Sequence, residues 1–287
     1  MLAGFVIFLR EGTEASIIIA VLLSYLERSG HRRHFKAVFL GAGIAGLLAA
    51  AGGVAAYLTI HTYAGSRAQT IFETATYAVA VIILTYMTFW MRAHAKTISK
   101  ELSARAESTI GKKERLGLAL LAFQAVGREG LETAVFTLAI VFAAGTKQTL
   151  LGGLVGLVCA LGIAYAIFRA GKRLNLAIFF TTVGTLLIVF AAGLVADIVE
   201  NLQQLGWVHA LSSQMWNSTS VVSESSAIGD VFHSLFGYAD RPTALQAVCY
   251  VVYVAFAVGL YIAINRRGSS SKARATGDRG DLSAASS

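Results

Sequence analysis

Charged residues are scarce in this chain. Only 14% of its 287 residues are charged, whereas an ordinary soluble domain carries about 25%. The chain also has a single proline and two cysteines, and 56% of its residues are hydrophobic. This composition excludes a disordered chain, a disulfide scaffold and a coiled coil. It predicts a membrane protein that crosses the bilayer several times.

Sulfur ligands are scarce as well. Cys159 and Cys249 both lie in apolar stretches, where a thiol behaves as a small hydrophobic group. With only four methionines beside them, they provide no cluster of the soft ligands that select Cu(I). Neither a disulfide framework nor a copper site is therefore expected.

Apolar stretches long enough to cross a bilayer, about 20 residues each, follow one another along the chain. They are continuously apolar, without the alternation of a membrane β-barrel, so we expect an all-α fold. Seven transmembrane helices are predicted, at residues 2–26, 36–60, 70–91, 116–143, 149–168, 176–199 and 244–264. Because the first stretch carries charges in its middle and no basic segment before it, we expect it to remain in the mature protein.

These stretches form one membrane domain, residues 1–265, with a short tail after it. Within the domain we expect a first repeat at 1–92, a second repeat at 116–200, an outer loop at 201–241 and a seventh helix at 244–265. The tail, residues 266–287, is rich in serine, glycine and charge, so we expect it to be disordered.

Basic residues are distributed unevenly among the predicted loops. Loops on one side of the membrane, with the tail, hold 19 Lys and Arg residues, and those on the other side hold three. The positive-inside rule then places the N-terminus outside and the C-terminus in the cytoplasm. The net charge of +8 is explained by this topology, so no nucleic-acid partner is expected. The two remaining basic residues, Arg10 and Arg128, lie within predicted spans.

Both intramembrane arginines begin the same motif, R-E-G-x-E. It spans residues 10–14 in the first predicted helix and residues 128–132 in the fourth. The two copies are 118 residues apart, with three predicted spans in each half. An odd number of spans makes the second copy enter the membrane from the opposite side. The sequence therefore predicts two inverted repeats with a site near the middle of the membrane, as in many secondary transporters.

Helix geometry indicates what this motif can bind. Glutamates three residues apart fall on nearly one face, and the arginine can pair with the glutamate four residues on. Two facing copies would bring four carboxylates and two guanidinium groups together, with a formal charge near −2. Oxygen ligands without soft ligands favour a hard cation such as Fe, Mn, Mg or Ca. The predicted metal ligands are Glu11, Glu14, Glu129 and Glu132, with Arg10 and Arg128 orienting them.

A simpler interpretation is that the motifs only form buried ion pairs that hold the bundle together. Each charged side chain at the bilayer centre costs about 2.5–3.5 kcal/mol on insertion scales, which makes six of them expensive for packing alone. A fifth acid, Glu73, lies near the outer end of the third predicted span. It is a candidate extra ligand or an acid at the mouth of the pathway, or else an ordinary interfacial residue.

The motifs resemble those of a known family. The doubled R-E-G-x-E, the pair Phe72-Glu73, the run from Thr85 to Leu102 and the sequence AFQAVGREGLET are similar to the oxidase-dependent iron transporter family. The loop with Trp216, VVSESSAIGD and GYADRP resembles its bacterial EfeU-type branch. The resemblance covers the chain to about residue 265.

This resemblance implies an iron uptake permease in a bacterial cytoplasmic membrane, and not an enzyme. The motif glutamates would bind and pass iron, as Fe²⁺ or Fe³⁺, with no permanently bound cofactor. Besides the lipid bilayer, the implied partners are EfeO-like and EfeB-like extracytoplasmic proteins. The outer loop, with Glu224 and Asp230, is a candidate for iron capture or for docking a donor. The alternative for these two acids is an ordinary surface role.

Other functions remain open or are disfavoured. A permease for another cation, such as Mn or Pb, would use the same scaffold, because carboxylate sites discriminate by geometry. A retinal protein is disfavoured because the seventh span has no lysine, and a receptor would not need a doubled acidic motif. An intramembrane metalloprotease would need H-E-x-x-H, and a catalytic di-iron site would usually add Glu-x-x-His; neither occurs.

Overall fold

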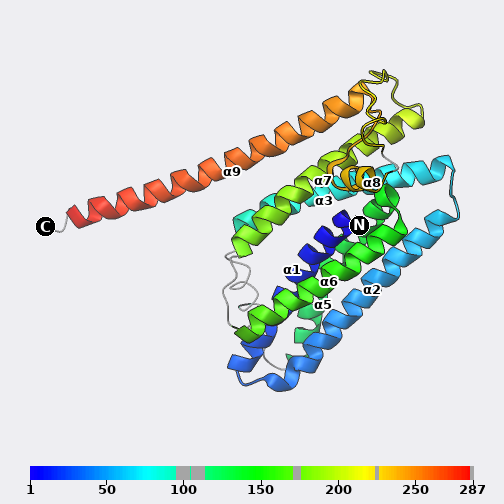
Figure 1. Cartoon of the computed structure of the whole chain (residues 1–287). Coiled ribbons are helices and arrows are strands. Elements are labelled where there is room, and N and C mark those ends of the chain that lie inside the picture. The colour runs from blue at the N-terminus through cyan, green and yellow to red at the C-terminus, as the bar shows by residue number, and fades with distance from the viewer. Residues whose placement is uncertain (95–103, 105–113, 171–175, 224–225, 285–287) are drawn as a thin grey trace.

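The computed structural model describes residues 1–94, 104, 114–170, 176–223 and 226–284. In this part of the chain the regular elements are helices, and the one β-bridge, between Gln214 and Thr243, is isolated. In chain order, as labelled in Figure 1, they are α1 (Leu2–Arg28), the short 3-10 helix η1 (Arg32–His34), α2 (Phe35–His61), α3 (Arg67–His94), α5 (Glu114–Ala144), α6 (Thr146–Ala170), α7 (Leu176–Gln204), α8 (Ala227–Phe236) and α9 (Ala244–Ala284). The expected all-α fold is confirmed.

Five of these helices are long and apolar enough to cross a membrane. They are α2, α3, α6, α7 and the first part of α9, Ala244–Ile264. The other two helices that contain predicted spans, α1 and α5, carry R-E-G-x-E in their middle. Every window of 18 residues in either helix therefore contains more than two charges. Length and composition thus confirm a multi-pass membrane protein but do not by themselves establish seven spans.

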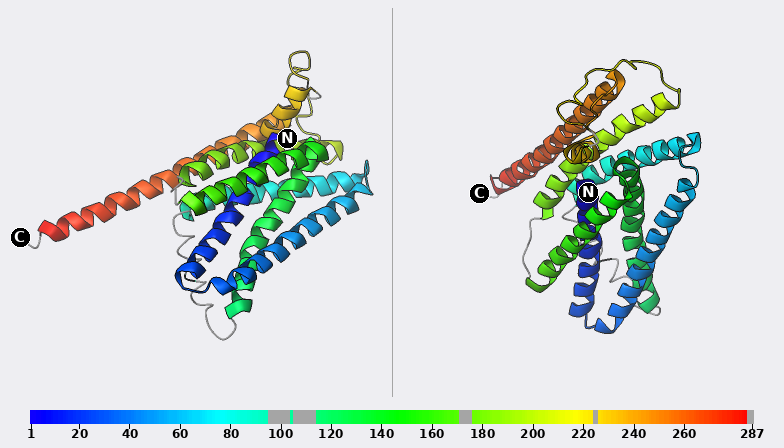
Figure 2. Two further views of the ribbon diagram at one scale, coloured as in Figure 1. Left: turned by 60° about the horizontal axis from the view of Figure 1, so that its bottom comes forward. Right: turned by 45° about the vertical axis from the view of Figure 1, so that its right-hand side comes forward.

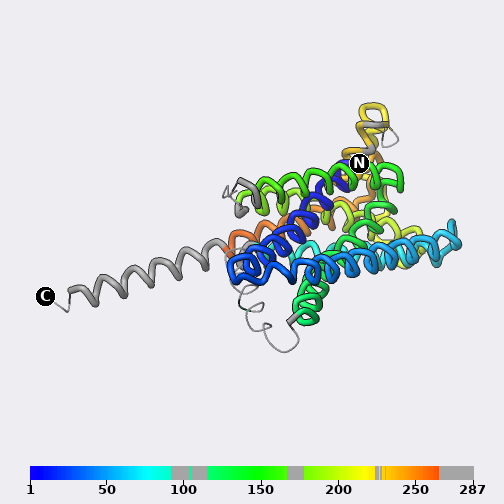
Figure 3. The backbone as a smooth tube through the Cα atoms, turned by 90° about the horizontal axis from the view of Figure 1, so that it is seen from below, coloured from blue at the N-terminus to red at the C-terminus, as the bar shows by residue number. Residues whose placement is uncertain are grey.

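The long helices pack in pairs. α1 lies along α6, α2 lies along α5, and α3 lies along α7, while α1 and α5 also contact each other. Figures 1 and 2 show α1, α2, α5 and α6 as one group, with α3, α7 and α9 beside it. In Figure 3 the start of α1 lies among the green turns of α5 and α6. The two motif-bearing helices are therefore in contact with each other, each covered by a more apolar partner helix.

Glycines set the closest approaches within these pairs. A Cβ on Gly41 of α2 would lie 2.1 Å from the carbonyl oxygen of Ala119 on α5. Likewise, a Cβ on Gly152 of α6 would lie 2.0 Å from the carbonyl oxygen of Met1 at the start of α1. Only glycine permits helices to approach this closely, as at small-residue interfaces in membranes.

The same contacts recur in the motif region. A Cβ on Gly12 would lie 2.9 Å from the Cβ of Ala160, and one on Gly130 would lie 2.8 Å from the Cβ of Ala49. Met1, at the start of α1, and Gly12 on α1 correspond to Ala119 and Gly130 on α5, each 118 residues later. In the same way, Gly41 and Ala49 on α2 correspond to Gly152 and Ala160 on α6, each 111 residues later. The pair α1–α6 therefore has the same register as the pair α5–α2.

Two apolar clusters lie along α1 and α5, one on each side of the motifs. The first apolar cluster lies between α1, α3, α5 and α7, and its members on α1 and α5 include Ala3, Val6, Ile7, Phe136, Ala139 and Ile140. The second apolar cluster lies between α1, α2 and α5, and its buried members are Leu22, Leu23, Leu26, Val38, Leu118 and Ala122. The charged motifs thus lie between two regions of close apolar packing.

Part of the predicted outer loop is helical. Its first residues continue α7 to Gln204, and α8 forms within it. The hydroxyl of Ser226 accepts a hydrogen bond from the Gly229 amide at the start of α8, and Gly237 ends the helix with a φ of 64°. At that end a Cβ on Gly193 of α7 would lie 2.7 Å from the Cα of Gly237. α8 packs against α7, α5 and α1.

α9 is drawn as a helix as far as Ala284, well past its apolar part, and residues 285–287 lie outside the described residues. The disordered tail at 266–287 stays a prediction. Figure 1 shows this part of α9 extending beyond the other helices. The apolar segment before it already supplies a helical nucleus, and lengthening an existing helix adds one hydrogen bond per residue without a new nucleation step.

The glycine contacts give a direct test of the packing. Gly41→Ala would force a Cβ against the Ala119 carbonyl, so we expect it to destabilise the protein by about 1–3 kcal/mol, the usual cost of overpacking. Gly43→Ala, on the same helix with nothing within 4 Å, is the matched control and should be neutral or stabilising. Thermal unfolding in detergent measures both, and equal melting temperatures for the two variants would contradict the packing described.

Candidate functional site

Both motifs lie at contacts between helices. The glycine of each motif faces the partner helix: Gly12 faces Ala160 of α6, and Gly130 faces Ala49 of α2. The glutamates beside these glycines lie on the side where α1 and α5 meet. The small residue therefore allows close packing on one face of each helix, while the carboxylates occupy another face.

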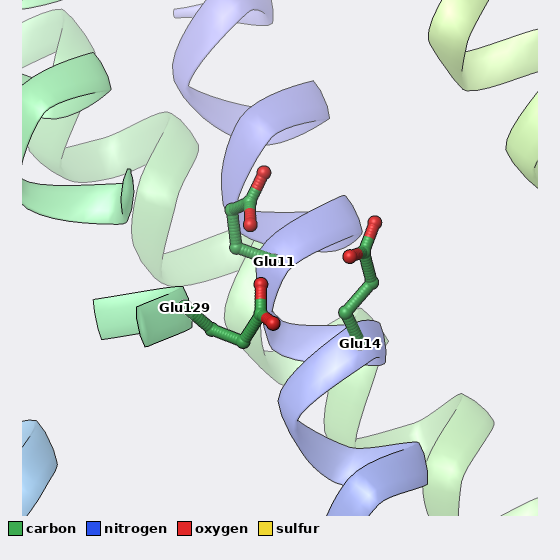
Figure 4. Close-up of side chains that lie close together, drawn as sticks. All are labelled: Glu11, Glu14 and Glu129. Carbon is green, nitrogen blue, oxygen red and sulfur yellow. The ribbon is translucent and has the colours of Figure 1, made fainter. Parts of the chain in front are cut away.

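Three carboxylates come together between α1 and α5. Oxygens of Glu11, Glu14 and Glu129 all lie within 4.8 Å of one another. Figure 4 shows Glu129 reaching toward α1, where Glu11 and Glu14 lie. All three residues are buried, with exposed fractions of 2%, 4% and 2%. Three oxygen ligands from two helices at this spacing form a suitable site for a hard cation.

Arg10 holds the two glutamates of its own motif. Its Nη1 donates to Oε1 of Glu11 at 3.1 Å, and its Nε lies 3.0 Å from Oε1 of Glu14. The arginine is buried as deeply as the glutamates. The predicted pairing of Arg10 with Glu14, four residues apart, is thus present, and Glu11 is held as well.

Arg128 is arranged differently. Its Nη2 donates to Oε1 of Glu129 at 2.8 Å, while its Nε lies 3.5 Å from Oε1 of Glu132. Its side chain is 50% exposed, and the guanidinium lies over the ring of Trp90 on α3, 5.5 Å from the centroid. Glu132 is not one of the three grouped carboxylates. The second motif therefore contributes one carboxylate, Glu129, to the group of three, and Arg128 pairs with both of its glutamates.

Several carboxylate oxygens remain available as ligands. Oε2 of Glu11, Glu129 and Glu132 are buried and have no hydrogen-bond partner within the described residues. A buried carboxylate oxygen without a donor is costly, and a bound cation is one way to satisfy it. The six motif side chains together carry a formal charge of −2, which one divalent cation would neutralise.

The other predicted site residues lie apart from this group. Glu73 is partly buried on α3, and its Oε1 accepts a hydrogen bond of 2.6 Å from Gln69. Asp230 lies on α8, and Glu224 falls outside the described residues. The structure thus brings three of the five predicted ligands together.

Sequence reasoning did not identify Trp90 as a neighbour of the site. It belongs to the run from Thr85 to Leu102 that resembles the iron transporter family, but nothing in its spacing relates it to Arg128. The contact depends on how α3 crosses α5. Such a crossing is set by packing between distant segments, which a local sequence pattern does not encode.

Comparisons with known proteins agree on one family. Residues 1–271 match the model of the iron permease FTR1 family. The chain is 33% identical over 263 residues to the ferrous iron permease EfeU of Yersinia pestis, covering 91% of this chain and 93% of that protein. It is 29% identical over 272 residues to the protein of the same name from an Escherichia coli strain, O6:K15:H31, covering 94% and 98%. No solved structure matches the chain.

The geometry predicts a ranking among the glutamates. Glu129→Gln removes one of the three grouped ligands, so it should weaken Mn²⁺ binding by more than about 100-fold, whereas losing an outer-shell group costs about 10- to 100-fold. Glu132→Gln should therefore weaken binding less, by about 10-fold. Glu27→Gln, at an exposed surface ion pair, is the control that should leave affinity unchanged. Loss of the Mn²⁺ EPR signal on titration in detergent measures all three, and equal effects of the first two variants would contradict the grouping.

Proposed function

Because the chain belongs to the iron permease FTR1 family, we propose that it imports iron through a site formed by its two R-E-G-x-E motifs. Family membership makes the chain a multi-pass membrane permease with iron as its substrate, and a transporter instead of an enzyme. The observation that carries the proposed site is the buried meeting of Glu11, Glu14 and Glu129 between α1 and α5. The remaining motif glutamate, Glu132, would join the ion during its passage.

The proposed cargo is Fe²⁺. The relatives from Yersinia and Escherichia are named ferrous iron permeases, and a divalent ion matches the formal charge of −2 at the motifs. Carboxylate oxygens suit this hard cation. Another divalent cation such as Mn²⁺ would find the same ligands, so selectivity depends on the geometry that the site adopts around the ion.

We further propose that the protein has seven spans, with two inverted repeats made of α1–α3 and α5–α7. Two observations support the crossing of α1 and α5. They pack against membrane-compatible helices along their length, and three of their motif carboxylates face each other between them. The recurrence of the same glycine contacts in α1–α6 and α5–α2 supports the repeats. In inverted-repeat transporters the site lies where the two halves meet.

Passage of the ion would then require alternating access. The first apolar cluster closes the site from one end of the bundle, and the second closes it from the other. Hydrated iron cannot cross either cluster while its packing is intact. Transport therefore requires that one cluster opens at a time, with α1 and α5 moving relative to their partners. Closed on both sides, the site protects a bound ion from water between these steps.

The proposed location is a bacterial cytoplasmic membrane, with the N-terminus outside and the C-terminus in the cytoplasm. The distribution of 19 basic residues against three supports this orientation. The outer loop with α8 then faces outward. It is the proposed place for iron capture or for docking an EfeO-like or EfeB-like donor, with Glu224 and Asp230 as candidate acids.

Iron uptake by cells tests the function. Glu14→Gln and Glu132→Gln should each abolish uptake of iron-55 while the protein inserts normally into the membrane. The first variant loses a grouped ligand, and the second loses the carboxylate that we expect to take over the ion. Glu27→Gln should transport at the wild-type rate. Wild-type uptake by either motif variant would rule out the proposed site.

The carried ion is identified in sealed vesicles with iron held as Fe²⁺ or as Fe³⁺. We expect uptake with Fe²⁺ alone. Competition by a tenfold excess of Mn²⁺ measures selectivity in the same assay. Uptake with Fe³⁺ alone would contradict the ferrous assignment, and faster transport of Mn²⁺ than of iron would favour the alternative cargo.

Cysteine labelling tests the orientation. In a variant in which both native cysteines are replaced by alanine, a membrane-impermeant maleimide should label Ser213→Cys, in the outer loop, on intact cells. Ser29→Cys, in the first loop, should be labelled only after permeabilisation. The reverse pattern would place the N-terminus in the cytoplasm, against the charge distribution.

A further inference from the structure

The two motif arginines have the same sequence neighbours but different surroundings. Both pair with the glutamates of their own motif, but Arg10 is 2% exposed, whereas the side chain of Arg128 is half-exposed at the surface of the bundle. A charged group at such a position within a membrane span needs support from polar or aromatic neighbours. The ring of Trp90 supplies it, because an indole attracts a cation placed over its face.

Arg128 connects Trp90 to the site. The same guanidinium that lies over the indole donates to Oε1 of Glu129 at 2.8 Å and lies 3.5 Å from Oε1 of Glu132. The Oε2 atoms of both glutamates have no hydrogen-bond partner within the described residues. The position of the guanidinium therefore decides which oxygen of each carboxylate is tied and which is available to an ion.

We propose that Trp90 is a positioning residue for the carboxylate site. Its indole holds the Arg128 guanidinium in the place from which it orients Glu129 and Glu132. Trp90 acts on the site through Arg128, whose guanidinium lies over its ring. The effect of Trp90 on iron transport rests on the proposed function, whereas its effect on the position of Arg128 does not.

The unequal support of the two arginines has a physical consequence. Arg10 is enclosed by the bundle, so its ion pairs are fixed by packing. Arg128 is held by Glu129 and Glu132 of its own helix and, from α3, by the indole of Trp90. Without the indole, its half-exposed side chain can turn its charged end toward the membrane surface. Glu129 and Glu132 would then lose their orienting partner. The affinity for the ion should then fall. The fold should be unchanged, because Trp90 is only partly buried.

Fluorescence tests the contact itself, without any transport. The chain has three tryptophans, so replacing Trp207 and Trp216 in the outer loop by phenylalanine leaves Trp90 as the only one. In this background Arg128→Gln should shift the emission maximum of Trp90, because it removes the charge over the ring. Arg10→Gln, the matched change in the other motif, should leave the maximum in place. Arg128→Lys and Arg10→Lys are the second pair if a glutamine variant is not monodisperse.

The same experiment has outcomes that overturn the proposal. An emission maximum that does not respond to a change at Arg128 would show that the two groups are not in contact. An equal shift from the changes at Arg10 and Arg128 would show a general rearrangement instead of a specific one. Either result would refute the positioning role and leave iron transport by the motif glutamates untouched.

Uptake kinetics test the consequence for the site. Trp90→Leu should raise KM for iron about 5- to 30-fold, the change in affinity equivalent to a desolvated cation–π contact, with the maximal rate nearly unchanged. Trp90→Phe keeps an aromatic face and should restore most of the affinity. Tyr86→Leu is the matched control, because Tyr86 lies one turn earlier on α3 and is 65% exposed.

Three results in this assay would contradict the role of Trp90. The first is a wild-type KM for Trp90→Leu. The second is a KM for Trp90→Phe as high as that for Trp90→Leu, since an aromatic face would then not matter. The third is an equal rise for Tyr86→Leu. If no variant or wild type transports iron at all, the proposed function fails, and the fluorescence result still decides the contact between Trp90 and Arg128.

Discussion

The burial of charge inside α1 and α5 is the constraint on which the rest of the structure depends. Six ionisable side chains lie in the middle of helices that are otherwise apolar, and each costs about 2.5–3.5 kcal/mol at the centre of a bilayer on insertion scales. The cost falls when the charges face one another, so the two helices must meet. α2 and α6 pack closely on another face of these helices, where Gly12 and Gly130 allow the approach.

The two copies of R-E-G-x-E have different surroundings in the fold. In the first motif, Arg10 ties Glu11 and Glu14 and all three are buried. In the second, the arginine is half-exposed, and only one of the two glutamates joins the grouped carboxylates. The two copies of the motif therefore differ in the burial of their arginines and in how many carboxylates they contribute to the group.

The chemistry of the site explains why so few ligands are enough. Three carboxylate oxygens within 4.8 Å of one another, in a setting shielded from water by two apolar clusters, attract a cation far more strongly than the same groups would in solution. The two arginines moderate this attraction, because they reduce the formal charge from −4 to −2.

Local patterns in the sequence predicted the helices of this protein and its candidate ligands. Long apolar stretches predicted the helices, and the repeat of R-E-G-x-E predicted its four glutamates as candidate ligands, because spacing along a helix is a local property. What the tertiary structure decided depends on contacts between distant segments. The contact of α1 with α5 grouped Glu129, and not Glu132, with Glu11 and Glu14. The crossing of α3 over α5 brought Trp90 to Arg128. α8 formed where packing against α7 supported a short helix, and α9 continued past its apolar part. Such contacts depend on how the surfaces of different helices pack together, and the spacing of residues within one helix does not determine that packing.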